Sequence, residues 1–373
     1  MALVDTMRFI GADPDQSFLF TAAEGLVPQT ALEASARHYR HKTDPVHGRS
    51  HHATVGRRVR ERLARLHGGE PEDIALLGNA SQGISAVYAL IDWRPGDNVV
   101  LVTSELEFPS VGLPAMKLLN AGDLEVRVVG HRDWVVEPSD VLDAVDERTR
   151  LVCASHVSYR TGFRLDIATI GAALRGSGTL FAVDATQSLG AIEVPATACD
   201  FVVSTSGKWM LGPYGVGPLY WNRERLPDVE PADIGWFSVV DDLAQPYELK
   251  PDAGRFEVGS LDWPAIYALD AGLEVIEEVG VDAIERHVVG LGGKLLDQLR
   301  EFDFDMVTPE DPTRRAGIVS WLDGNPSATA ARLAERGVFV TGSSGRIRAA
   351  FHLYNDETDV ERLVTALEAL QAG

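Results

Sequence analysis

Short apolar segments alternate with longer amphipathic ones as far as Trp221. Several of the short segments are unbroken runs of Val, Leu, Ala and Phe, which are typical of strands covered on both faces. We predict strands at 74–78, 98–104, 125–130, 151–156, 180–184, 201–205 and 217–221, and helices between them at 82–91, 110–120, 138–145 and 167–175. Alternating strands and helices favour an α/β fold with a doubly wound, mostly parallel sheet.

The pattern changes after Trp221. The segment 222–252 is rich in Pro and Asp and has few periodic apolar positions, which favours a long connection. Beyond it we predict helices at 261–279, 282–302 and 327–335, strands at 317–322, 338–341 and 346–352, and a last helix from Asn355 or Asp356. The chain is therefore expected to contain an N-terminal arm (1–20), a large domain (21–260) and a small α+β domain (261–373).

The composition excludes several classes of partner. The 373 residues include 34 Lys and Arg against 55 Asp and Glu, a net charge of −21. Such a chain repels nucleic acids and anionic membrane surfaces. It shows no signal-peptide pattern and no apolar run near the roughly 18 residues of a membrane helix, so we expect a cytoplasmic protein. Cys153 and Cys199 lie in apolar runs and are expected to be buried thiols, too few for a disulfide framework.

A lysine follows the strand predicted at 201–205 and precedes a glycine-rich loop. A lysine so close to a buried strand is unfavourable unless it has a task, and one task is a Schiff base with a carbonyl cofactor. The hydroxyls of Thr205 and Ser206 could then hold a phosphate. An exposed lysine at a strand end explains the position of Lys208 equally well.

Two further segments have the residue types of a ligand site. Asp184 closes a strand at the carboxyl edge, where open α/β sheets bind ligands. A carboxylate there can pair with a protonated pyridine nitrogen, and Gln187 can donate to a phenolate oxygen, although Asp184 could simply cap a helix. The residues Ala80, Ser81 and Gln82 open a helix after a strand, which is an anion-binding arrangement or an ordinary serine cap.

Together and in this order, these segments resemble the pyridoxal-phosphate (PLP) enzymes of fold type I, in the class V aminotransferase group. That group includes cysteine desulfurases, kynureninases, isopenicillin-N-epimerase-like enzymes and C–S lyases. The resemblance extends from Phe18 to Asn355. It implies PLP as the cofactor, Lys208 as the Schiff-base lysine and proton carrier, Asp184 as the partner of the pyridine nitrogen and Gln187 as the donor to the phenolate oxygen.

The resemblance also implies the rest of the site. Arg348 would clamp the α-carboxylate of an amino-acid substrate, while Tyr159, Arg49 and Trp236 would line the substrate pocket. The further cofactor-binding residues would be Ala80, Ser81, Gln82, Phe108 (stacked on the ring), Ser158, Thr205, Ser206, Gly259 and Ser260. The last two resemble a segment that reaches the phosphate of a neighbouring subunit, which implies a homodimer with shared active sites. Gly207 stands where many relatives have His, so one phosphate donor is missing or supplied elsewhere.

The reaction follows less directly from the resemblance. Cysteine desulfurases need a thiol shortly before the carboxylate-binding arginine, and the stretch 337–345 contains no cysteine. Kynureninases usually have His where Gln187 stands. We therefore expect β-elimination by a C–S lyase on a cysteine conjugate in small-molecule biosynthesis, ahead of a kynureninase-like hydrolase or a cysteine desulfurase. Epimerisation, transamination and decarboxylation or deamination stay open because the fold does not choose among them.

Proteins of other classes could share these features. A relative that binds amino acid or PLP without turnover is one alternative, and a nicotinamide-dependent oxidoreductase is another. The histidines 47, 51 and 52 are too loosely spaced for us to expect a metal site. The arginines 57, 58, 60 and 62 lie at helical spacing and are interpreted as the solvated face of a helix.

Overall fold

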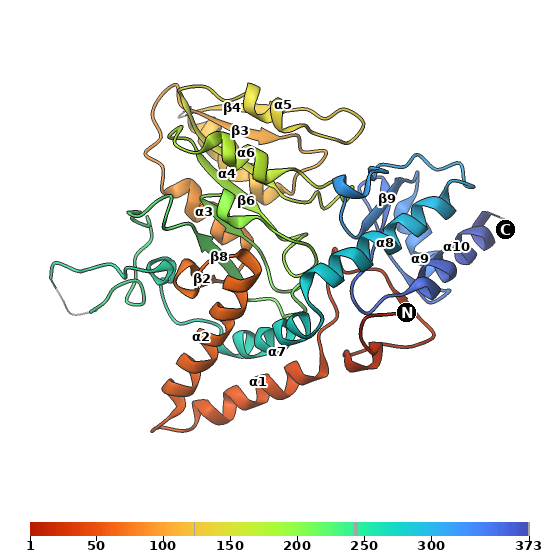
Figure 1. Cartoon of the computed structure of the whole chain (residues 1–373), viewed down its shortest axis with the longest axis horizontal. Coiled ribbons are helices and arrows are strands. Elements are labelled where there is room, and N and C mark those ends of the chain that lie inside the picture. The colour runs from red at the N-terminus through yellow and green to blue at the C-terminus, as the bar shows by residue number, and fades with distance from the viewer. Residues whose placement is uncertain (123, 242–244, 372–373) are drawn as a thin grey trace.

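A seven-stranded sheet forms the centre of the computed structural model, which describes residues 1–122, 124–241 and 245–371 (Figure 1). The order of its strands is β2-β8-β7-β6-β5-β3-β4. Their bounds are β2 (Ile74–Leu77), β3 (Asn98–Val102), β4 (Glu125–Val129), β5 (Thr149–Ser155), β6 (Leu180–Asp184), β7 (Phe201–Val203) and β8 (Gly217–Trp221). Strand β8 runs antiparallel to both of its neighbours, and the other strands of this sheet share one direction. The predicted doubly wound, mostly parallel sheet is confirmed.

Helices cover both faces of this sheet, which explains the unbroken apolar strands. The connecting helices are α3 (Ala80–Ala89), α4 (Pro109–Ala121), α5 (Pro138–Asp143) and α6 (Ile167–Leu174). Alternate residues of a strand point to opposite faces. In β3, Val99 and Leu101 join the core that includes α3 and α4, whereas Val100 and Val102 join the larger core on the other face.

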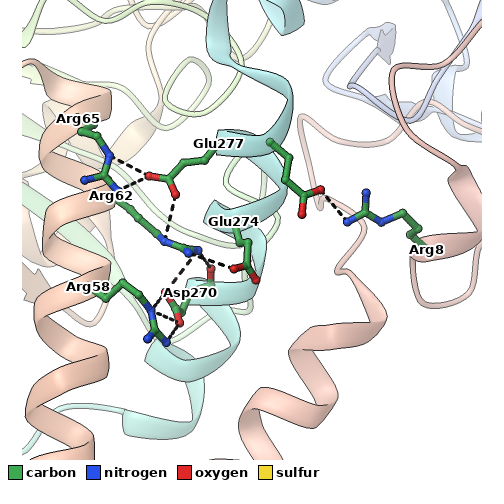
Figure 2. A network of polar contacts seen from close by, with 8 residues as sticks. Arg8, Arg58, Arg62, Arg65, Asp270, Glu274 and Glu277 are labelled. Carbon is green, nitrogen blue, oxygen red and sulfur yellow. Dashed lines mark hydrogen bonds and ion pairs between the residues drawn. The ribbon is translucent and has the colours of Figure 1, made fainter.

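Of the four arginines interpreted as a solvated helix face, Arg57 is exposed as predicted, whereas the other three pair with carboxylates. Helices α1 (Gln29–Lys42) and α2 (Gly48–His67) pack against α7 (Trp263–Val279). Arg58 and Arg62 both pair with Asp270 of α7, and Arg62 also lies 3.3 Å from Glu274 and 3.2 Å from Glu277 (Figure 2). The interpretation was wrong for Arg58 and Arg62 because the arginine stripe of α2 meets an acidic stripe about 200 residues away in sequence, which the pattern of α2 alone does not show.

A second, smaller sheet lies beside the C-terminal helices. It has the antiparallel order β11 (Thr341–Ser343), β12 (Arg346–Ala350) and β9 (Ile318–Leu322), and α8 (Val281–Leu299) runs to it from the end of α7 (Figure 1). Helix α9 (Pro326–Ala334) packs on β11 and β12, and α10 (Glu357–Gln371) packs on α8 and α9. This confirms the small C-terminal sheet, while the domain boundary at 261 stays a prediction.

The N-terminal segment joins this smaller part of the molecule. Strand β1 (Ser17–Phe18) pairs in parallel with β10 (Val338–Phe339), so both chain ends lie beside the small sheet (Figure 1). Of the connection predicted at 222–252, residues 242–244 lie outside the described residues. Within the described ranges, no helix is both long and apolar enough to cross a lipid bilayer.

Candidate active site

The predicted catalytic lysine and the predicted pyridine partner line the same small pocket. Asp184 is the last residue of β6, and Lys208 lies in the turn after the neighbouring strand β7. Because parallel strands end at the same edge of a sheet, their following residues meet there. The complete lining is Phe108, Ser155, Val157, Tyr159, Asp184, Thr186, Gln187 and Lys208. The pocket thus unites five of the residues predicted from sequence.

Lys208 has the environment of a reactive amine. Burial and, to a smaller extent, the charge of Arg348 lower its pKa to about 8 against the opposing effect of Asp184. Its Nζ lies 5.7 Å from the ring centroid of Phe108. The backbone around it is clamped, since Gly25 donates to the carbonyl of Gly207 over 3.0 Å and a Cβ on Gly25 would collide with the carbonyl of Lys208. The lysine therefore has a fixed backbone and loses its proton far more readily than an ordinary lysine.

Asp184 and Gln187 provide the polar wall of the pocket. Asp184 is buried, and its Oδ1 accepts a 2.8 Å hydrogen bond from the amide of Thr186. Burial raises the pKa of this carboxyl group. Gln187 Nε2 donates to the carbonyl of Ala22 over 2.9 Å, and its Oε1 accepts from Trp209 Nε1 over 2.8 Å. An amide nitrogen carries two hydrogens, so one N–H of Gln187 is left to donate to a ligand.

Glu107 is a buried carboxyl group to which the sequence analysis assigned no role. It accepts from the amide of Ser155 over 2.7 Å and from its hydroxyl over 2.6 Å. Burial raises the pKa of Glu107 to about 7 against the opposing effect of the hydrogen bonds from Ser155. The contact fixes the end of β5 beside the pocket. The one sequence signal was an acidic residue directly before the aromatic Phe108.

Arg348 lies on β12, across Tyr159 from the pocket. It is 7% exposed; its Nη1 donates to the carbonyl of Tyr159, and its Nη2 lies 3.3 Å from the hydroxyl of Thr341. Burial lowers its pKa to about 10. The Tyr159 ring also meets the Phe108 ring edge-on, with 5.2 Å between centroids. The predicted carboxylate clamp is therefore linked to the predicted stacking residue through one tyrosine.

Residues 17–363 match the Aminotransferase class-V family. The chain belongs to this family. It is 29% identical over 398 aligned positions to a probable cysteine desulfurase of Methanothermobacter thermautotrophicus, which covers 99% of this chain and 98% of the relative. The apo cysteine desulfurase of Thermococcus onnurineus NA1 superposes with a TM-score of 0.88 at 26% identity, covering 98% of this chain and 97% of the other.

The C–S lyase C-DES has the same fold. Its complex with cysteine persulfide, described as the product of this cystine C–S lyase, gives a TM-score of 0.86 at 24% identity over 95% of this chain and 97% of that one. A C-DES mutant with glycine linked to PLP gives 0.87 at 23% identity over 98% and 99%. The present class-V chain is a PLP-dependent enzyme with the fold type I architecture.

The pocket fits PLP at its ring end. A buried carboxylate is unfavourable without a cation, and a protonated pyridine nitrogen would supply one beside Asp184. The free N–H of Gln187 suits a phenolate oxygen, and the amine of Lys208 suits a carbonyl carbon. The residues of the pocket therefore match the donors and acceptors of the cofactor ring.

The predicted phosphate end is arranged differently from the expectation. Ser206 Oγ donates to backbone carbonyls of its own loop, including Val216 O at 2.8 Å, and Ser81 Oγ lies 2.6 Å from Ser110 Oγ. Asn79 caps the start of α3 by accepting from the amide of Gln82 over 2.9 Å, and Gln82 Oε1 accepts from the amide of Gly78 over 2.9 Å. Thr205 is half-buried in the turn after β7, between Asp184 and Lys208 in the sequence.

The space beside Gly207 is filled by an aromatic ring. A Cβ at this position would lie 2.9 Å from the ring of Tyr214, closer than real Cβ contacts allow. Tyr214 is held by its hydroxyl, which lies 3.5 Å from the carbonyl of Ala23. A His side chain at position 207 would therefore collide with the ring of Tyr214 where it now lies.

Several predicted site residues lie away from the lysine pocket. Arg49, Trp236 and Ser260 line a separate cavity of about 620 Å³. Gly259 lies in a further pocket, which Ser260 and Gln82 share. Ser158 is near the active site, but its hydroxyl donates to the carbonyl of Leu106 over 2.8 Å and shapes the turn that carries Tyr159.

Proposed function

We propose that this class-V enzyme is a C–S lyase, which eliminates a sulfur substituent from the β-carbon of a cysteine-type amino acid. The observation that supports it most is the state of the two thiols. Cys153 in β5 and Cys199 before β7 are both 0% exposed, and burial raises the pKa of each. A thiol must be an accessible thiolate to attack a sulfur atom. Neither cysteine meets that condition, so transfer of sulfur to the protein lacks a nucleophile.

The segment before Arg348 supports the same proposal. It is a β-hairpin in which Thr341 pairs with Arg348 and Ser343 pairs with Arg346. The turn between the strands consists of Ser344 and Gly345, with φ values of 52° and 76°. A desulfurase would need a mobile loop with a cysteine in this segment, whereas the present chain has a short β-hairpin without one.

The described side chains can carry the elimination. PLP, when bound, accepts electrons from the α-carbon of an amino acid joined to it. Arg348 binds the α-carboxylate, for which its buried Nε has a free N–H. Lys208 Nζ takes the α-proton as a neutral amine, which its lowered pKa favours. The sulfur leaves the β-carbon with the electron pair of its bond, and water releases pyruvate and ammonia from the remaining carbon skeleton.

We further propose that the active form is a homodimer. Arg49, Trp236 and Ser260 share one cavity that is separate from the Lys208 pocket of the same chain. In a dimer with shared sites, Gly259 and Ser260 would reach the phosphate bound by the other copy, and Arg49 and Trp236 would line its substrate entrance. Size-exclusion chromatography with light scattering measures the oligomeric state directly.

The test of the lyase supplies PLP-loaded protein with cystine and, in a parallel reaction, with cysteine. From cystine we expect equimolar pyruvate and cysteine persulfide, with no persulfide on the protein and no reaction of Cys153 or Cys199 with a thiol reagent before unfolding. Cys153→Ala/Cys199→Ala should keep the activity, whereas Lys208→Ala should lose it together with the visible absorbance of the bound cofactor. Alanine formation with a protein persulfide, or exchange of the α-proton without thiol release, would overturn the proposal in favour of a desulfurase or an epimerase.

A further inference from the structure

Three arginines surround Tyr159 at the edge of the active site. Arg346 and Arg348 are two residues apart on β12, so their side chains lie on the same face of the strand. Arg348 Cζ lies 5.8 Å from the centroid of the Tyr159 ring. Arg160 approaches from the other side, with its Nε 2.9 Å from the hydroxyl of Tyr159. The chain therefore gathers three positive charges at one place in a molecule whose net charge is −21.

Within the part of the chain that the structure describes, two of these guanidinium groups are buried without an anionic partner. Arg346 is 8% exposed and Arg348 is 7% exposed. Nη1 of Arg346 and Nε of Arg348 have no hydrogen-bond acceptor among the described residues. No ion pair within those residues involves either side chain, although many other arginines of the chain are paired. Burying an unpaired guanidinium is unfavourable, so the arrangement is that of a site completed by an anion.

Arg346 is held in place by a constrained loop. Its Cζ lies 5.5 Å from the ring centroid of Trp134, which stacks on His131 with 4.6 Å between centroids. Trp134 and the preceding Asp133 have φ values of 65° and 49°, in the left-handed region that non-glycine residues rarely adopt. Strained backbone of this kind collects at functional sites, where the surrounding structure compensates for it.

The other charges that face Arg346 leave it with an excess of positive charge. Burial and the charge of Arg160 lower its pKa, while Tyr159 and Glu105 act in the opposite direction. Glu105 is largely exposed and lies 3.4 Å from Nε2 of His131. One solvated carboxylate does not neutralise the group of three arginines.

We propose that Arg346, together with Arg160, binds a second anionic group at the end of the substrate's side chain. The substrate class is then an amino acid with two acidic groups, for example an S-carboxyalkyl cysteine. The inference rests on the proposed function, in which Arg348 takes the α-carboxylate. Two residues of strand span about 7 Å, close to the separation of two carboxyl groups joined by about four chain atoms.

The test compares S-carboxymethylcysteine with its neutral amide, S-carbamoylmethylcysteine. For the PLP-loaded wild type we expect kcat/KM for pyruvate release to be about 10- to 100-fold higher with the acid. Arg346→Gln should remove this preference, so that kcat/KM for the acid and the amide become about equal. Arg346→Lys should restore part of it, and Arg336→Gln, an exposed arginine, should keep it in full. Equal kcat/KM values for acid and amide in the wild type, or an unchanged preference in Arg346→Gln, would overturn the inference.

A binding measurement separates this inference from the proposed function. Adipate, a dicarboxylate with no sulfur to eliminate, should raise the melting temperature of the PLP-loaded wild type more than pentanoate does, and Arg346→Gln should abolish that difference. If neither cysteine conjugate yields pyruvate but adipate stabilises only proteins with Arg346, the lyase proposal fails and the anion site stands. If adipate and pentanoate act alike in the wild type, the anion site fails.

Discussion

At the scale of single residues, burial decides the chemistry of the side chains around the pocket. The pKa of Lys208 is lowered and that of Asp184 is raised, in both cases mainly because the charged form is removed from water. Lys208, Asp184 and Gln187 were predictable because each follows an apolar strand. Glu107 and Arg346 were not, because an unpaired or desolvated charge is visible only once the neighbours are known.

The charge of Arg348 should set part of the reactivity of Lys208. In PLP-free protein, acetylation of Lys208 followed by peptide mass spectrometry should rise with pH around a midpoint of about 8, well below the roughly 10.4 of an ordinary lysine. Arg348→Gln removes a repelling charge and should move the midpoint upward, although burial keeps it below the ordinary value. Arg94→Gln, at an exposed position, is the matched control. An unchanged midpoint in Arg348→Gln would contradict the electrostatic contact.

At the scale of elements, the sequence pattern predicted the strands of the large sheet, whereas the contacts of helix α2 depended on the helix packed against it. Every strand predicted in the large sheet is present, since unbroken apolar runs have no alternative to burial on both faces. Strand β7 ends at Val203 rather than at residue 205 because the chain turns there toward Lys208. The role of α2 was misjudged because its partner, α7, supplies the opposite charges.

The contact of α2 with α7 should depend on one arginine far more than on another. The Arg62 side chain is 10% exposed and touches three acidic residues, whereas that of Arg65 is 60% exposed and pairs only with Glu277 (Figure 2). Arg62→Met leaves Asp270 buried with less compensation and should lower the free energy of unfolding by about 3 kcal/mol. Arg65→Met should lower it by less than about 1 kcal/mol.

Urea unfolding followed by circular dichroism at low salt measures both effects. Equal losses for the two variants would show that α2 and α7 are held together by their apolar contacts alone.

At the scale of the whole molecule, the fold keeps several histidines neutral in its core. Burial lowers the pKa of His67 to about 4, of His352 to about 4 and of His156 to about 3. An unfolded histidine has a pKa of about 6.5, so the unfolded chain binds these protons first as the pH falls. Their contribution to stability is therefore complete above pH 6.5 and is lost as the pH falls toward the folded values.

His67 isolates this effect from the carboxyl groups that titrate in the same range. It is buried against Tyr220, with 5.4 Å between ring centroids, and its Nδ1 lies 2.7 Å from the carbonyl of Leu63. Between pH 7 and pH 5, His67→Gln should lose about 2 kcal/mol less free energy of unfolding than the wild type. The exposed His47→Gln should lose as much as the wild type. Parallel pH profiles for wild type and His67→Gln would contradict a buried neutral imidazole.

The sequence by itself determined the α/β fold, the family and the residues that end its strands. Apolar runs must be buried, which fixes the strands. Asp184 and Gln187 at the end of one such run and Lys208 after the next are brought together at the carboxyl edge of a parallel sheet. Only the tertiary structure decided which charges lose their water and which find partners. It placed the stripe of α2 on α7, turned Ser206 toward its own loop and left Arg346 beside Arg348 without an anion. Desolvation and pairing depend on neighbours that are distant in sequence, and no local pattern of residues contains them.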